Sequence, residues 1–156
     1  MQSKSRVRSR HRPPWDEDRI AALKRVISSL TGLSSRDLVI VEGPKDASSL
    51  KRLGVRAGII TAGSFGKVTG LEEDGRLRIR DSRTVFLPDF DREGGEKIRK
   101  WRSELSSSKN VDSATWRILS SLLKSEGIGI EGLARLAEKL NLLKKEMWLG
   151  PDERVS

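Results

Sequence analysis

Residues 84–94 read TVFLPDFDREG, and this stretch decides the fold because it joins an apolar run to a turn that carries two aspartates. A second apolar run, Leu38–Val41, is followed in the same way by Glu42 and Gly43. Neither run alternates apolar with polar residues, which is typical of a strand buried on both faces of a parallel sheet. We therefore expect two neighbouring parallel strands that each end in acidic residues.

The acidic side chains at these strand ends predict a metal site. Neighbouring strands lie about 4.8 Å apart, so side chains at their shared carboxyl edge converge, and residues two apart such as Asp89 and Asp91 point the same way. Crowded carboxylates repel one another unless they are protonated or share a cation. Oxygen ligands alone favour a hard ion, so Glu42, Asp89 and Asp91 predict one or two magnesium ions, with manganese as a substitute. A simpler interpretation stays open, in which the aspartates only cap the next helix.

The overall composition indicates the kind of partner. The chain has 156 residues and a formal net charge of +9, which predicts one domain with a polyanionic partner. No apolar run approaches the roughly 20 residues that span a bilayer, no signal-peptide pattern opens the sequence, and cysteine is absent. We therefore expect a cytoplasmic protein that does not contact a membrane. The lack of tyrosine excludes a tyrosyl nucleophile, and the only histidine, His11, lies in a basic tail.

The amino-terminal part divides into an arm and a helix. Residues 15–34 are expected to form a helix that begins at acidic residues 16–18 and ends at Gly32. Residues 1–14 are predicted to be a disordered arm that either aids solubility or binds phosphate, and the positive charge of the whole chain favours phosphate. The arm is basic at every second position, with Lys4, Arg6, Arg8, Arg10 and Arg12.

A strand-helix-strand unit is predicted next. The strand at Leu38–Val41 is followed by a helix that Asp46 can cap and that ends at Gly54. Residues 55–61 are the second strand, and residues 62–66 are a loop. This order implies a right-handed crossover and parallel pairing.

The rest of the chain is predicted to contain a hairpin, a third strand and three helices. The hairpin lies within residues 66–83, the strand at Thr84–Leu87, a helix at 92–105 and a linker at 106–110. Two closing helices are expected to pack on the core within residues 111–148; Asp112 or Ser113 caps the first, and the second runs from Glu131 to Leu143. Residues 127–130 between them are predicted to be a short edge strand, and Trp101 and Trp116 to fill the core.

Two stretches resemble a known family. VIVEGPKDASSLKRLG at 39–54 and VFLPDFDREGGEKIRKW at 85–101, with TAGS at 61–64 between them, are similar to a Toprim domain. The family signature is a glutamate after the first strand and D-x-D-x-x-G after a later one. The resemblance implies an α/β, Rossmann-like fold for residues 35–110, with a central, mainly parallel sheet and helices on both faces. In length and layout the chain looks like the small stand-alone archaeal Toprim proteins, which are close to the 5S ribosomal RNA maturation nucleases.

The resemblance also implies roles for particular residues. Glu42 matches the family's general acid or base and a metal ligand, and Asp89 and Asp91 match the magnesium-binding carboxylates. Asp46 matches an acidic position of the nuclease-like branch, although a helix cap is an equal interpretation. Pro44 departs from the lysine of the maturation nucleases and is more similar to the topoisomerase loop.

The expected function is magnesium-dependent binding of nucleic acid, RNA in preference to DNA, with cleavage of phosphodiester bonds in RNA maturation. The alternatives are a binding module without turnover, in which magnesium bridges to phosphate, and a primase-like nucleotidyl transfer. No particular protein partner is indicated. The residues predicted to contact nucleic acid, each of which is otherwise an ordinary charged surface residue, are Lys45, Lys67, Arg92, Lys97 and Arg99, together with Arg6, Arg8, Arg10 and Arg12 of the arm.

Overall fold

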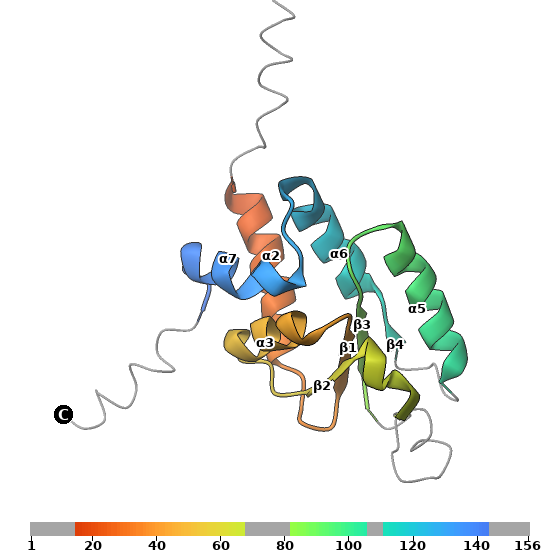
Figure 1. Cartoon of the computed structure of the whole chain (residues 1–156). Helices are drawn as coiled ribbons and strands as arrows, with labels where there is room; N and C mark the ends of the chain where they lie inside the picture. The colour runs from red at the N-terminus through yellow and green to blue at the C-terminus, as the bar shows by residue number, and fades with distance from the viewer. Residues whose placement is uncertain (1–14, 68–81, 106–110, 144–156) are drawn as a thin grey trace, which may run out of the picture.

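The fold is α/β and is built on one parallel sheet. The computed structural model describes residues 15–67, 82–105 and 111–143 (Figure 1). Within them the strands lie in the order β2-β1-β3-β4, and every neighbouring pair is parallel. This confirms the predicted fold class. The strands are β1 (Leu38–Val41), β2 (Gly58–Thr61), β3 (Thr84–Leu87) and β4 (Val111–Asp112).

Strands β1, β2 and β3 end at the same level. Val41 at the end of β1 pairs with Thr61 of β2 on one side and with Leu87 of β3 on the other. The residues that follow β1 and β3 therefore emerge side by side at the carboxyl edge of the sheet. In open α/β sheets this edge is where ligands bind.

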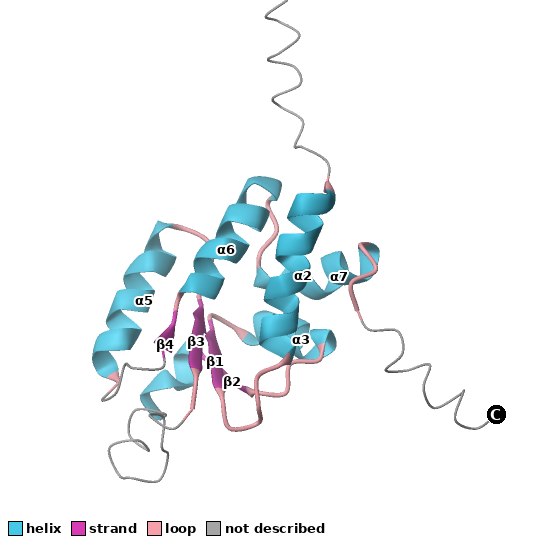
Figure 2. Ribbon diagram, turned by 180° about the vertical axis from the view of Figure 1, so that it is seen from behind, coloured by secondary structure: helices cyan, strands magenta, loops and turns pink. Residues whose placement is uncertain are grey.

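Helices cover both faces of the sheet (Figure 2). On one face, Val39, Val41, Val85 and Leu87 join the larger apolar cluster with α2, α3, α6 and α7. On the other face, Ile40 and Phe86 pack with Phe65 and with α5. The helices are α2 (Glu17–Thr31), α3 (Pro44–Leu53), α5 (Arg92–Glu104), α6 (Ala114–Leu123) and α7 (Leu133–Lys139), and the 3₁₀ turns are η1 (Ala62–Ser64), η3 (Lys124–Glu126) and η4 (Ile130–Gly132).

Strands β1 and β3 have the bounds that the sequence predicts, and α2 lies within the predicted residues 15–34, with Asp16 and Gly32 as its caps, whereas β2 is shorter than predicted. The predicted strand over 55–61 begins only at Gly58. The reason is that Gly54 is left-handed, with φ 102°, and the Val55 N–H donates to Leu50 O at 3.1 Å, which closes α3. The predicted loop at 62–66 is also wrong, because residues 62–64 form η1 and residues 65–67 continue as helix.

The carboxyl-terminal segment differs most from the prediction. Residues 127–130 are not a strand, because Gly127 is left-handed with φ 71° and the Ile128 N–H donates to Leu123 O to end the preceding helix. The edge strand is β4 instead, next to β3. The last helix ends at Lys139 rather than at Leu143, since Asn141 is left-handed with φ 63°.

Some predictions fall outside the described residues. These are the basic arm at 1–14, most of the hairpin at 66–83, the linker at 106–110 and the residues after 143. In the part of the chain that is described, we find no helix with the length and apolar character needed to cross a membrane.

Candidate functional site at the carboxyl edge of the sheet

Three of the predicted acidic residues meet in one hollow. Glu42, Asp46 and Asp89 line a hollow of about 550 Å³, which we call the carboxylate hollow. Glu42 follows β1 and Asp89 lies just beyond β3, so the level strand ends bring them together. The remaining lining residues are Gly43, Pro44, Lys45, Gly129, Ile130 and Glu131.

Asp46 is not the N-cap residue of α3, but it helps to cap the helix from the N3 position, as in a capping box. Gly43 takes the N-cap position and Pro44 is the first helical residue, a place that suits proline because no N–H is needed there. Asp46 therefore lies inside the first turn, where its carboxylate accepts a hydrogen bond from the Gly43 N–H at 3.1 Å. Only 8% of the residue is exposed, so its charge is held close to the protein interior.

Asp89 and Asp91 have different surroundings. Asp91 is the N-cap of α5 and its Oδ1 accepts from the Gly94 N–H at 2.8 Å, which is the capping role that the simpler interpretation gave it. Asp91 is absent from the lining of the carboxylate hollow, whereas Asp89 is part of it. The two aspartates thus share one turn but only Asp89 faces the hollow.

The turn that carries Asp89 is held by two close contacts. A Cβ on Gly94 would lie 2.1 Å from the Asp89 carbonyl oxygen, so the first turn of α5 approaches the backbone as only glycine allows. Trp116 of α6 donates from Nε1 to the Pro88 carbonyl oxygen at 2.8 Å. The predicted core position of Trp116 is therefore only partly right, because its indole also fixes this turn; Trp101 is buried as predicted.

Lys97 of α5 is the countercharge of Glu42. Its Nζ lies 2.7 Å from Oε1 and 2.8 Å from Oε2 of Glu42. The hydrogen bond to Glu42 raises the pKa of Lys97, and the charges of Glu42, Asp89 and Glu93 raise it further. Lys97 is therefore a positively charged ammonium group that contacts both oxygens of the Glu42 carboxylate.

The carboxylates of the hollow repel one another. Burial raises the pKa of Asp46, and the charges of Glu131 and Glu42 add to this, while hydrogen bonds from the backbone of Gly43 and Glu131 oppose it. Asp89 is an exposed residue, yet partial desolvation of its carboxylate raises its pKa, and Glu42, Asp46 and Asp91 contribute in the same direction. The hollow therefore concentrates negative charge that a cation would stabilise.

The donors suit a hard cation in kind but are not arranged around one. They are all carboxylate oxygens, the ligands that magnesium prefers. Among the residues that the structure describes, no three acidic or histidine side chains converge closely enough to hold an ion. Glu42 is engaged by Lys97 and Asp91 by Gly94, so side chains must rearrange before a metal is held.

Sequence similarity to other proteins shows which family the chain belongs to. It is 35% identical over 105 residues to a UPF0292 protein of Pyrococcus abyssi, and the aligned region covers 67% of this chain and 76% of the relative. The chain belongs to the UPF0292 family. A second UPF0292 protein, from Pyrococcus horikoshii, is 37% identical over 106 residues, which are 76% of its length. One from Thermococcus onnurineus is 37% identical over 103 residues, which are 74% of its length. No protein-family model matches the chain, and no solved structure gave a significant match.

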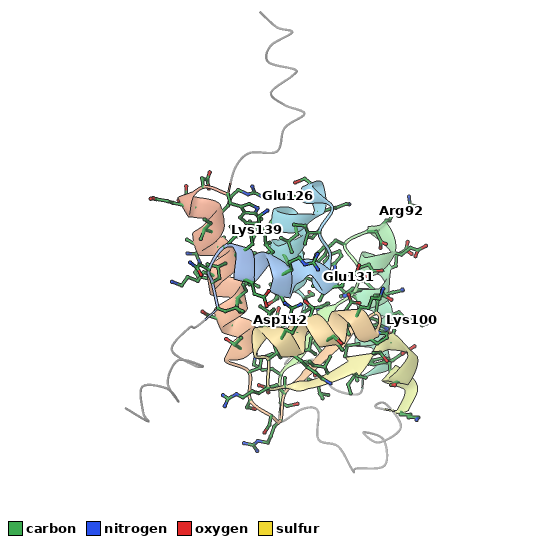
Figure 3. The ribbon with its side chains drawn as sticks, turned by 60° about the vertical axis from the view of Figure 1, so that its left-hand side comes forward. Arg92, Lys100, Asp112, Glu126, Glu131 and Lys139 are labelled. Atoms are coloured by element: carbon green, nitrogen blue, oxygen red, sulfur yellow. The ribbon has the colours of Figure 1, made fainter. Side chains whose placement is uncertain are left out.

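In this UPF0292 chain the predicted basic residues are divided between several places. Lys45 lines the carboxylate hollow and Lys97 pairs with Glu42. Arg92 and Arg99 are exposed on α5, where Figure 3 labels Arg92, and neither lines the hollow. Lys67 is exposed in the helical turn after η1, and the arginines of the arm lie outside the described residues.

Sequence reasoning missed one acidic residue of this UPF0292 site. Glu131 lies in η4 and lines the carboxylate hollow, because η4 and α7 pack against α3. Figure 3 shows Glu131 close to α3. It follows no strand and is 85 residues from Asp46 in the sequence, so no local pattern indicates that the two meet.

Proposed function

We propose that this UPF0292 protein is Toprim-like and uses magnesium to bind RNA and to cleave a phosphodiester bond in it. The observation that carries the proposal is the meeting of Glu42, Asp46 and Asp89 in one hollow at the carboxyl edge of a parallel sheet. The glutamate follows the first strand and the aspartate a later one, which is the order of the Toprim signature. The formal charge of +9 supports a polyanionic substrate.

The residues divide into those that hold the ion and those that handle the substrate. Glu42, Asp46 and Asp89 would hold magnesium, and bound magnesium would polarise a phosphate oxygen and activate a water. Glu42 would take or give the proton at the reacting oxygen. Lys97 would leave Glu42 and contact a phosphate oxygen, since its raised pKa keeps it positively charged.

RNA cleavage by a Glu42→Gln variant tests the catalytic part. Structured RNA is incubated with magnesium and with the full chain, the variant or the control Glu96→Gln, which changes the same group at an exposed position of α5. We expect the control to match the wild type and Glu42→Gln to be slower by about a hundredfold or more, the usual cost of losing a general base. Equal cleavage by wild type and Glu42→Gln, or cleavage by neither, would contradict the proposed nuclease activity.

A binding module without turnover is the second candidate, and the state of Glu42 favours it. Lys97 holds both of its carboxylate oxygens, so Glu42 is not free to act as a base in this arrangement. For such a module, magnesium increases the affinity for RNA while the RNA stays intact, and Asp89→Asn abolishes that increase. Affinity that is independent of magnesium in both proteins would contradict this candidate.

A further inference from the structure

A second hollow adjoins the carboxylate hollow and has the opposite charge. It measures about 380 Å³ and lies between α3 and the η4–α7 segment; we call it the basic hollow. The two hollows share Lys45 and Glu131 in their linings, so they lie next to each other. The basic hollow is lined by Lys45, Ser48, Ser49, Arg52, Glu131, Gly132 and Arg135.

Two cations of the basic hollow have no acidic partner among the described residues. Arg52 pairs with Glu138 at 2.5 Å, so its charge is compensated. Lys45 and Arg135 are exposed, and neither forms an ion pair within the described part of the chain. Their positive charge is therefore available to an anion that enters the hollow.

The two cations lie on α3 and α7, and a buried hydrogen bond fixes the position of these two helices relative to each other. Ser49, which is only 3% exposed, accepts a hydrogen bond at its Oγ from the Ala134 N–H at 3.0 Å, and this joins α3 to α7. Leu50 and Leu133, both completely buried, pack in the core beneath this contact. The backbone positions of Lys45 on α3 and Arg135 on α7 are thus held at a set spacing, so only their side chains must be ordered when both bind one ligand.

We propose that the basic hollow is a phosphate subsite, in which Lys45, Ser48 and Arg135 hold the phosphate of a nucleic-acid strand next to the one in the carboxylate hollow. This inference rests on the proposed function and adds the path of the strand to it. In this proposal the strand runs from the carboxylate hollow toward α7, because the basic hollow adjoins the carboxylate hollow on that side. Arg99 on α5, which the sequence predicts to contact nucleic acid, lies off this path.

Binding of a labelled single-stranded RNA oligonucleotide to the full chain tests the path. It is measured in magnesium at several salt concentrations, with the integrity of the RNA checked by gel. Arg135→Gln and Lys45→Gln should each weaken binding roughly fivefold and reduce the slope of log affinity against log salt by about 0.7. Arg99→Gln and the control Arg56→Gln, at the opposite edge of the sheet before β2, should change the affinity less than about twofold.

A second measurement separates the subsite from the proposed function. Inorganic pyrophosphate is titrated into the wild type and Arg135→Gln, and the backbone amide signals of Ser48 and of residue 135 are followed by NMR. Saturable shifts in the wild type that the variant loses support the subsite; if the wild type then binds no RNA, the proposed function fails and the subsite stands. If the wild type binds RNA while Arg135→Gln binds it as tightly as Arg56→Gln does, the subsite is overturned and the proposed function stands. Equal urea midpoints for the variants show that they are folded.

Discussion

Replacing Gly94 by alanine should displace the turn that carries Asp89. The new Cβ would lie 2.1 Å from the Asp89 carbonyl oxygen and 3.0 Å from Cζ2 of Trp116, whereas ordinary contacts begin at 3.4 Å. Side-chain rotation cannot relieve the first contact, because its partner is a backbone atom. The turn must therefore move by about 1 Å, and Asp89 moves with it.

The neighbouring Gly95 supplies the matched control. A Cβ there would lie 3.9 Å from Cη2 of Trp116, which is an ordinary contact. Alanine is favoured over glycine in a helix by up to about 1 kcal/mol, and this gain is common to both positions. Overpacking against a backbone atom costs about 3 kcal/mol, so Gly94→Ala should lose about 2 kcal/mol of unfolding free energy and Gly95→Ala should gain up to about 1 kcal/mol.

Urea unfolding of the two variants and the wild type measures this difference. The gap between Gly94→Ala and Gly95→Ala, about 3 kcal/mol, isolates the contact with Asp89 because the helix propensity cancels. Manganese titration should show weaker binding by Gly94→Ala alone, since only that substitution moves Asp89. If the two variants unfold at the same urea concentration, the close approach of α5 to the turn is not what makes glycine necessary at position 94.

Three further substitutions test other contacts. Lys97→Met removes the countercharge of the carboxylate that would hold metal, so calorimetry should show manganese binding about threefold tighter; unchanged affinity would mean that Lys97 does not compete with the ion. Asp37 accepts N–H groups of Ser34 and Arg83 at 2.8 and 2.9 Å, which outweigh its burial and lower its pKa, so Asp37→Asn should cost about 2 kcal/mol at pH 7 in urea unfolding. Because the folded pKa is the lower one, that stabilisation is complete above the ordinary value of 3.8 and the cost should shrink as the pH falls through the folded pKa; a cost that does not depend on pH would contradict the charge argument. Trp116→Phe leaves the Pro88 carbonyl oxygen without its donor and should cost about 1 to 2 kcal/mol, and a variant as stable as the wild type would show that water replaces the indole.

The central strands are predictable because an unbroken apolar run has few interpretations. Leu38–Val41 and Thr84–Leu87 are found at their predicted bounds, and both are buried along their whole length. A strand that is buried on both faces needs no alternation, and its end is marked by the first polar residues. The positions of Glu42 and Asp89 follow directly, because parallel strands bring their carboxyl ends to one edge.

The carboxyl-terminal part of the site is not predictable in this way. Residues 127–130 have the composition of a strand, but the backbone N–H groups of Gly127 and Ile128 close the helix before them. Glu131 and Arg135 have the pattern of an ordinary exposed helix surface, and only the packing of α7 on α3 brings them to the two hollows. The tertiary contact through Ser49 and Ala134 spans 85 residues, and no local sequence pattern carries that information.

The unbalanced negative charge of the carboxylate hollow is the physical reason for proposing a binding function at this edge of the sheet. In a purely structural cluster, acidic side chains are neutralised by basic partners of the same chain. Here Glu42 has Lys97, whereas Asp46, Asp89 and Glu131 form no ion pair with any described residue. Folding brings Asp46 and Asp89 to positions where their ionised forms are less favourable, as their raised pKa values indicate. A cation from outside the chain would stabilise the negative charge that remains. A phosphate, which is itself negative, could approach the hollow only after that charge is neutralised.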